Sequence, residues 1–511
     1  MKYVLCFALL ASLISCSPTA DTQTTKTDRF QQAMDQLQTY FNIPGLAILV
    51  KSGDQIRYEH YQGFANIDTQ TPVDSATLFP IASVSKIFAA TIIFQLVEEG
   101  KLDLEKSVKT YLLQTPLNEA IKVKHLLAHT SQGTPGNGFL YSSRFSLLTQ
   151  LVEHVSSQTY EQLLQDYIID KLDLKSTYGL TNHAKVQALQ PRLATPYFPP
   201  NEAGIYDPGL STASGIVSTV RDLAQFDDAL NEFSLLSQQR FQQMTSPYIS
   251  NSGEKQPYGL GIFSQNFIED SLYWGYGQND CFSSLFLKVP NKDLTFILLA
   301  NTNLLSDPAR LIYGDVTYSL FAMAFLEHFV YDWPKKLDFF DGTKQQEWFN
   351  AFATFKRDDY IAFYHQKLRA TALAASFMGG IDAEQYQLSR QLLNFSAFLK
   401  PPYPHHLSDL HALSILHEQG IDSLTYNIEE IAQAFIHKSP ENPYPKVYLG
   451  FYYVKEEKTE QAVQVFQELI NIPQTSPNWY TLEALAYLAH QRRENPEDEA
   501  IAREWIEFLE S

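Results

Sequence analysis

The stretch "FPIASVSKIFAATIIFQLVEEG" (residues 79–100) predicts the end of a short strand followed by an amphipathic helix. Ser83 and Lys86 lie near the first turn of this helix, and a spacing of three places both side chains on one face. The plain interpretation is a solvent-exposed turn. The sharper interpretation is a serine nucleophile with a lysine beside it as proton acceptor.

The position of this pair at a helix start favours the chemical interpretation. Free N–H groups and the helix dipole favour negative charge that develops on a serine there. A lysine carried into the interior one turn later loses solvation, so its pKa falls toward a value useful for proton transfer. A lone Ser-x-x-Lys occurs about once or twice by chance in a chain of 511 residues, so the surrounding blocks must support it.

Composition excludes two broad classes of protein. Hydrophobic residues make up 45% of the chain and charged residues 19%, which is enough apolar material for a sizeable core and argues against global disorder. The formal net charge is −19, whereas a nucleic-acid binder needs a basic face for phosphates.

The first residues predict a targeting segment. A lysine precedes a short apolar run that ends in "LISC", and this ending resembles the bacterial lipobox, in which the peptide is cut before Cys16 and the thiol is acylated. A plain secretory signal is the alternative. We therefore expect a signal peptide over residues 1–15, a flexible tether over 16–28, and an extracytoplasmic, lipid-anchored protein, at the outer membrane or in the periplasm if the cell is Gram-negative.

The rest of the chain predicts two domains. Residues 29–331 have strand patterns at both ends and helical patterns between them, which predicts an α+β domain with one antiparallel sheet whose first and last strands pair. One helix is expected at 123–133, and a strand is expected at 258–264. After a linker over 332–342, residues 343–511 predict an α-helical domain. Part of it matches a tetratricopeptide repeat, with a generic helical bundle as the alternative; the matching residues are Leu449, Gly450, Tyr453, Ala462 and Phe466.

Several separate blocks of residues 29–330 resemble the class C β-lactamase-like serine hydrolases. They include "LFPIASVSKIF", "VKHLLAHTSQG", "FLYSSRFSLL", "SGIVSTVRDLAQF" and "LANT", in the order that this family shows. The family includes penicillin-binding-protein-like esterases, D-aminopeptidases and carboxypeptidases. The resemblance implies an antiparallel sheet flanked by helices, with the active site between the sheet and an all-α lobe.

The resemblance also assigns roles to residues. Ser83 matches the family nucleophile and Lys86 its partner, while Tyr141 in "YSS" stands where the family has Tyr-x-Asn. Beside an ammonium, a tyrosine can act as phenolate, so which of Lys86 and Tyr141 holds the proton is a property of the coupled pair. Ser143 replaces the family's asparagine, and a serine hydroxyl can reach only one of the groups that the amide would hold.

The third family motif is altered as well. Tyr276, Gly277 and Gln278 occupy the place of Lys-Thr-Gly or His-x-Gly, so a neutral hydroxyl replaces a cation that would attract a substrate carboxylate. The backbone N–H of Gln278 or Asn279 is expected to complete an oxyanion hole with that of Ser83. These departures favour a neutral ester or amide substrate.

Other candidate residues have simpler explanations. His125 and His129 are four apart, which would suit a metal pair on one helix, but the Glu of His-Glu-x-x-His is missing and the block resembles a structural one. Cys281, near the expected site, reads as a small buried residue. We expect no metal and no cofactor.

The sequence therefore predicts a serine hydrolase that works through an acyl-enzyme on a small-molecule or peptide substrate. The alternative is a catalytically weak scaffold that binds a protein or cell-wall partner. In either case the helical domain offers a surface for a protein partner, no nucleic acid is expected, and membrane contact is through the lipid anchor alone.

Overall fold

The computed structural model describes residues 25–206, 208–331, 333, 336–399, 406–421, 423–470 and 479–493. Cys16 and the expected signal peptide lie outside these residues. The first helix, α1 (Lys26–Phe41), begins inside the expected tether, where Thr25 and Asp28 form a capping box. No helix in the described part of the chain is both long and apolar enough to cross a membrane.

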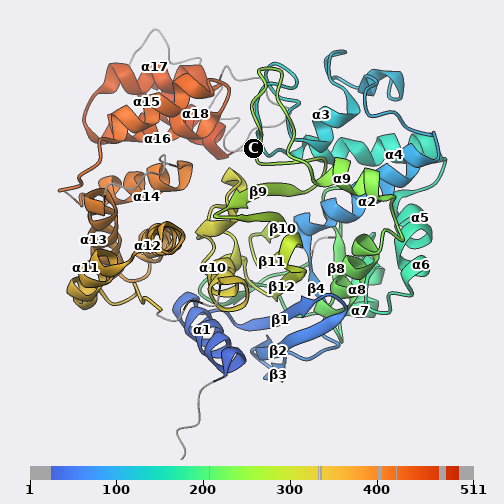
Figure 1. Cartoon of the computed structure of the whole chain (residues 1–511). Coiled ribbons are helices and arrows are strands. Elements are labelled where there is room, and N and C mark those ends of the chain that lie inside the picture. The colour runs from blue at the N-terminus through green and yellow to red at the C-terminus, as the bar shows by residue number, and fades with distance from the viewer. Residues whose placement is uncertain are drawn as a thin grey trace, which may run out of the picture.

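The centre of the molecule is a seven-stranded antiparallel sheet (Figure 1). Its strands are β1 (Gly45–Ser52), β2 (Gln55–Asn66), β3 (Thr71–Pro72), β9 (Phe263–Phe267), β10 (Asp270–Asn279), β11 (Phe282–Val289) and β12 (Leu294–Ala300). They follow the order β3-β2-β1-β12-β11-β10-β9. The first long strand pairs with the last, with Leu46 opposite Ala300, as the sequence predicts. The strand expected at 258–264 begins only at Phe263.

The two faces of this sheet belong to different hydrophobic cores. Ala47 and Leu49 of β1 pack in one cluster, and Leu46, Ile48 and Val50 pack in the other. Side chains alternate between the faces of a strand, so a strand covered on both faces reads as a continuous apolar run. "GLAILV" in β1 is such a run.

One face is covered by helices from the middle of the chain. They are α2 (Ser85–Glu98), α3 (Val123–Leu127), α4 (Leu148–Ser156), α5 (Tyr160–Leu164), α6 (Asp170–Leu172), α7 (His183–Leu189), α8 (Val220–Asn231) and α9 (Gln238–Thr245). Short strands between them form two small sheets: β4 (Phe79–Pro80), β8 (Ile216–Ser218) and β5 (Tyr178–Gly179) form one, and β6 (Tyr197–Phe198) and β7 (Glu202–Ala203) form the other.

Two expected helices differ from the observed ones. The prediction that α2 is amphipathic is wrong, because its residues from Ser85 to Leu96 are all buried and the helix runs through the core. The helix expected at 123–133 ends at Leu127, and His129 beyond it has a φ of 53°. A φ of 53° lies outside the α-helical region of the backbone, so the helix cannot continue through His129.

The other face of the sheet carries α1, α10 (Leu320–Phe325) and the C-terminal helices, drawn in orange and red (Figure 1). The latter are α11 (Gln345–Thr354), α12 (Asp358–Met378), α13 (Glu384–Leu399), α14 (Leu407–Glu418), α15 (Ile428–Lys438), α16 (Pro443–Lys455), α17 (Thr459–Ile470) and α18 (Trp479–Arg493). The C-terminal region is thus helical, as predicted. Gly450 of α16 lies against the ring of Phe466 in α17, so these helices pack closely, while the assignment to tetratricopeptide repeats stays a prediction.

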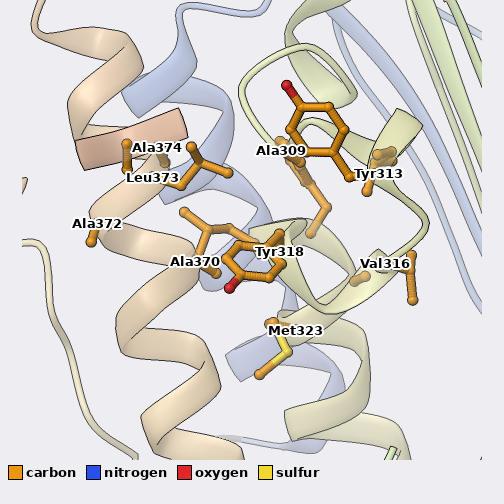
Figure 2. Packing of buried hydrophobic residues seen from close by; sticks show 14 of the residues in the cluster. Ala309, Tyr313, Val316, Tyr318, Met323, Ala370, Ala372, Leu373 and Ala374 are labelled. Carbon is orange, nitrogen blue, oxygen red and sulfur yellow. The ribbon is translucent and has the colours of Figure 1, made fainter. Parts of the chain in front are cut away.

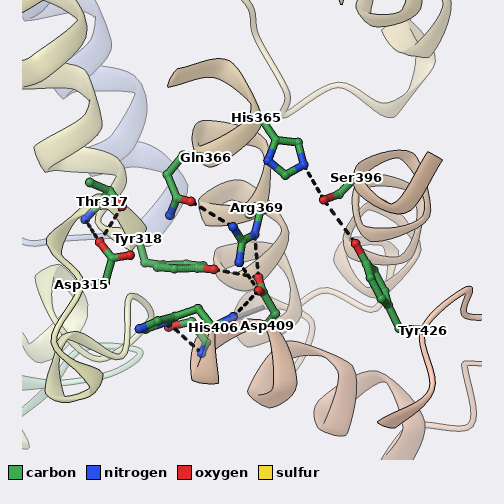
Figure 3. Close-up of polar contacts among 11 residues, drawn as sticks. Asp315, Thr317, Tyr318, His365, Gln366, Arg369, Ser396, His406, Asp409 and Tyr426 are labelled. Carbon is green, nitrogen blue, oxygen red and sulfur yellow. Dashed lines mark hydrogen bonds and ion pairs between the residues drawn. The ribbon is translucent and has the colours of Figure 1, made fainter. Parts of the chain in front are cut away.

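The hydrophobic core continues across the expected linker at 332–342. Trp333, Leu337 and Phe339 are buried in the same cluster as the outer face of the sheet and the C-terminal helices. Figure 2 shows another part of the same cluster, where Tyr318 and Met323 lie next to helix α12. A buried ion pair adds to it: Arg369 of α12 donates to Asp409 of α14, and Tyr318 donates to the same carboxylate at 2.8 Å (Figure 3). The expected linker is therefore packed within a core that both regions share.

Candidate active site

A short turn holds Ser83 between the small sheet and α2. Strand β4 pairs with β8, and the Ile81 N–H donates to the Ile216 carbonyl at 3.0 Å. The 3₁₀ turn Ala82–Val84 follows, and Ala82 has a φ of 43°, in the left-handed region that a residue with a Cβ rarely adopts. This turn leaves Ser83 half-buried at the start of the buried helix α2.

Lys86 lies directly behind Ser83, as the spacing predicts. Its Nζ is 2.8 Å from Ser83 Oγ and 3.1 Å from the carbonyl oxygen of Ala213. The side chain is only 4% exposed, and burial lowers the pKa of Lys86 to about 7. A neutral amine at this position can accept the proton of a serine hydroxyl.

Tyr141 completes this group and lies next to both Ser83 and Lys86. It is hydrogen-bonded to Ser83, and Lys86 Nζ lies 4.9 Å from the centroid of its ring. Burial raises the pKa of Tyr141, and the hydrogen bond with Ser83 only partly opposes this. The directions of the two pKa shifts favour a neutral Lys86 beside a protonated Tyr141 over the phenolate that the sequence suggested.

An aromatic shell fixes the ring of Tyr141. His129 stacks on it at 4.2 Å between centroids, and Phe263 stacks on it at 5.7 Å. Nδ1 of His129 accepts from the Ser142 N–H at 3.1 Å, whereas Nε2 is buried with no hydrogen-bond partner among the described residues. Burial, followed by the charge of Lys86, lowers the pKa of His129 well below its usual value. The block "LLAHTSQG" resembles a structural block of the family, but the sequence carries no signal that His129 supports Tyr141.

The two histidines do not share a helix. His125 lies in α3, where its Nδ1 accepts from the Lys122 N–H at 3.2 Å, while His129 lies beyond the end of that helix. Their spacing of four therefore does not bring them to one helical face. Among the described residues, no cluster of three or more His, Cys, Asp or Glu side chains could hold a metal ion.

The end of β10 forms the wall opposite the nucleophile turn. A Cβ on Gly277 would lie 2.1 Å from the Ile81 carbonyl oxygen, so only glycine permits the strand to approach the turn this closely. Tyr276 points away from that contact and is buried, with its ring 5.7 Å from that of Tyr141. Its ring therefore belongs to the aromatic shell, and a role in binding substrate stays a prediction.

A cavity of about 350 Å³ opens beside Ser83. Lys86, Gln278, Asn279 and Cys281 also line it. The remaining residues of the predicted site lie outside its lining; they are Tyr141, Ser143, Tyr276 and Gly277. Ser143 is exposed and is not a partner of Lys86, whose hydrogen bonds go to Ser83 and Ala213. Cys281 is buried, and burial together with Asp280 raises its pKa to about 11, so it remains a thiol.

Gln278 connects this cavity to the C-terminal helices. Its side-chain amide donates to Asp307 at 3.1 Å, and Arg310 donates to the same carboxylate oxygen at 2.8 Å. Arg310 Nε then donates to His411 Nε2 of α14 at 3.1 Å. The sequence carried no signal for this connection, because its members are far apart along the chain.

Comparison with known proteins agrees with this geometry. The family model described as Beta-lactamase matches residues 30–315, more than half of the chain. Protein flp of Staphylococcus aureus (strain MW2) is 25% identical over 307 residues, which cover 51% of this chain and 60% of that protein. Penicillin-binding protein 4* of Bacillus subtilis (strain 168) is 24% identical over 332 residues, which cover 53% of this chain and 72% of that protein.

A solved structure shows the same fold. The octameric penicillin-binding protein homologue from Pyrococcus abyssi superposes with a TM-score of 0.51 at 22% identity, covering 58% of this chain and 76% of that one. The residues matched by the family model include β1 to β12, the Ser83 turn and Tyr141. On its sheet topology, its Ser-x-x-Lys geometry and this match, the chain belongs to the beta-lactamase family of penicillin-binding-protein-like serine hydrolases.

Proposed function

We propose that this chain is a serine hydrolase that cleaves neutral esters or amides through an acyl-enzyme on Ser83. The observation that carries the proposal is the buried contact of 2.8 Å between Lys86 Nζ and Ser83 Oγ, with no carboxylate among the hydrogen-bond partners of that amine. Burial without a counter-charge lowers the pKa of Lys86 to about 7, so a substantial fraction of the amine is neutral near pH 7, which suits a general base.

The acylation step follows from these contacts. Lys86 accepts the hydroxyl proton as Ser83 Oγ bonds to the substrate carbonyl carbon, and the carbonyl becomes an oxyanion. Backbone N–H groups of Ser83 and of Gln278 or Asn279 are proposed to hold that oxyanion. The carbonyl re-forms as the bond to the leaving group breaks, and the leaving group takes a proton that Lys86 delivers through the hydroxyl of Tyr141.

Deacylation reverses these roles. Water attacks the acyl carbon and passes a proton to the same pair, and Ser83 Oγ leaves with the proton returned to it. The products are an acid and an alcohol or amine, and the enzyme regains its starting protonation state. Tyr141 stays close to its protonated form throughout and acts as a relay, which agrees with the raised pKa of its buried phenol.

Two variants and two probes test the proposal. Ser83→Ala should abolish hydrolysis of a p-nitrophenyl ester without unfolding the protein, and wild-type turnover in this variant would show that the assignment is wrong. Tyr141→Phe should slow turnover by about 10²-fold or more, the scale of losing a general acid–base group. Intact-mass analysis after incubation with a fluorophosphonate should find one adduct that maps to Ser83, and a parallel incubation with a penicillin tests whether the site also accepts an amide that bears a carboxylate. Absence of both adducts and of turnover would favour the alternative, a scaffold that binds without catalysis.

We also propose that the protein is held at a membrane by a lipid on Cys16. The support is the "LISC" sequence, in which the expected cleavage position lies directly before Cys16. Cys16→Ser should move the protein from the membrane fraction to the soluble fraction, because a chain without acyl groups has no such anchor. Equal membrane association of variant and parent would contradict the proposal.

A further inference from the structure

Apolar side chains dominate the cavity beside Ser83. Leu180, Phe198, Ile205 and Phe282 line it together with the ring of Tyr206. The Tyr206 hydroxyl donates to the Ala194 carbonyl, and its ring lies 6.1 Å from that of Phe282, so this residue offers the cavity a hydrocarbon surface.

Two of these side chains are exposed at the mouth of the cavity. Ile205 is 87% exposed and Phe198 is 38% exposed. Apolar side chains that meet solvent beside a concave site gain free energy when a ligand covers them. The volume of about 350 Å³ lies at the low end of the range for small-molecule pockets, which suits one compact apolar group.

The cavity offers little to a charged group. Lys86 is the only Lys, Arg or His among the described residues that line it, and its Nζ is held by Ser83 and Ala213. The side-chain amide of Gln278 is held by Asp307. A substrate carboxylate buried here would lose its hydration without gaining a free cation.

The position of Tyr141 decides which half of the substrate the cavity receives. A general acid must lie next to the atom that leaves, and Tyr141, whose ring centroid lies 4.9 Å from Lys86 Nζ, is not part of the lining of the cavity. The leaving group is therefore directed toward Tyr141. The other substituent of the carbonyl carbon, the acyl group, is directed into the cavity.

We propose that the substrates are esters or amides of carboxylic acids whose acyl chain is apolar and bears no charge. Phe198 and Ile205 select this acyl chain. This inference rests on the proposed function, because it assumes attack by Ser83. It adds the chemical class of the acid and the residues that recognise it.

The test is a series of p-nitrophenyl esters with acetyl, butanoyl, hexanoyl and octanoyl groups, hydrolysed by the full chain. Each buried methylene can raise kcat/KM by up to about fourfold, so hexanoate should exceed acetate at least tenfold. Hemisuccinate, with a terminal carboxylate on a short acyl chain, should lose that gain. Methyl and hexyl hexanoate should differ by less than threefold, because the alcohol lies outside the cavity.

Variants test which residues are responsible for the preference for a longer acyl chain. Phe198→Ser with Ile205→Ser should reduce the hexanoate-to-acetate ratio by about tenfold. Leu113→Ser is the matched control, since Leu113 is 85% exposed and does not line the cavity, and it should keep the wild-type ratio.

The outcomes separate this inference from the proposed function. Hydrolysis that depends on Ser83 but is equal for all acyl lengths, or that follows the alcohol instead of the acid, would overturn the apolar acyl site and leave the hydrolase intact. A preference for the acyl chain that survives the double variant would overturn the assignment to Phe198 and Ile205. No turnover dependent on Ser83 with any ester would overturn the proposed function itself.

Discussion

Lys86 beside Ser83 and Lys288 beneath helix α8 are both buried, but their surroundings differ in one respect. Lys288 lies 3.0 Å from a carboxylate oxygen of Asp227, which is itself fully buried, whereas the partners of Lys86 are a hydroxyl and a carbonyl. Burial lowers the pKa of Lys86 to about 7. Although burial raises the pKa of Asp227, Lys288 and Lys51 lower it below its ordinary value.

The contacts around Asp227 link strands of the central sheet to helix α8. Lys51 of β1 and Lys288 of β11 both lie opposite Thr295 of β12, so three neighbouring strands present one polar row to Asp227 of α8. Thr295 also donates to Asp227 at 2.8 Å. A buried lysine with a carboxylate thus connects the sheet to a helix, whereas a buried lysine without one has the lowered pKa that the proposed general base requires.

The largest expected effect is that of Lys86→Met. Loss of the proton acceptor should reduce kcat/KM for a neutral ester by about 10³-fold, within the usual range for general acid–base groups. The free energy of unfolding should not fall, because the variant removes a buried amine that has no counter-charge and replaces it with an apolar chain of similar length. Steady-state kinetics and urea denaturation at pH 7 measure the two quantities. A clear loss of stability would contradict the comparison.

Asp227→Asn should have the opposite effect: a loss of stability with little loss of activity. It leaves two buried lysines facing an uncharged amide, and breaking a buried ion pair in this way typically costs about 3–5 kcal/mol. Chemical denaturation should show this loss, while kcat/KM of the fraction that remains folded should stay within about threefold of wild type. Retained stability would mean that the two ammonium groups are solvated in the folded protein.

Lys288→Met is a milder change at the same site. Asp227 keeps its contact with Lys51 at 3.0 Å, so the loss should be about 1.5–3 kcal/mol, the scale of one hydrogen bond to a charged group. The measurement is the same denaturation series. A loss equal to that of Asp227→Asn would show that Lys51 cannot hold the carboxylate alone.

The titration of Lys86 and that of Asp227 should affect activity and stability in different pH ranges. Ester hydrolysis should rise tenfold per unit below about pH 7 and level off above it, as Lys86 becomes neutral. The folded pKa of Lys86 lies below its ordinary value of 10.5, so between about pH 7 and 10 the unfolded chain binds the extra proton and the free energy of unfolding rises with pH.

For Asp227 the folded pKa is lowered, so its contribution is complete above the ordinary carboxylate value and is lost as the pH falls through the folded value. As the pH rises from about 7 to 10, the free energy of unfolding of wild type should therefore approach that of Lys86→Met, whose methionine does not titrate. The free energies of unfolding of wild type and Asp227→Asn should converge only in acid. A plateau of activity that extends to pH 5 would contradict a neutral Lys86 as the base.

Features carried by local sequence were predictable. The strands β10, β11 and β12 follow from apolar runs bounded by turns, and the pairing of β1 with β12 follows from strand patterns at both ends of the domain. The contact of Ser83 with Lys86 follows from a spacing of three residues across a helical turn. The helical C-terminal region follows from its periodicity.

Features made by distant residues were not predictable. Lys86 bonds to Ala213, which is far along the chain, and Gln278 reaches His411 only through Asp307 and Arg310. The burial of α2 on all sides was also missed, since periodicity describes one helix and says little about how many neighbours surround it.

The sequence by itself indicated most of the elements, the contact of Ser83 with Lys86 and the family, because these depend on residues within a few turns of one another. The tertiary structure decided which buried lysine lacks a carboxylate partner, which side chains line the cavity, and that the C-terminal helices share a core with the sheet. The physical reason is that desolvation and charge pairing depend on what lies around a side chain in space. Folding brings those neighbours together from segments that are far apart along the chain, and the local sequence of each segment does not indicate the contact.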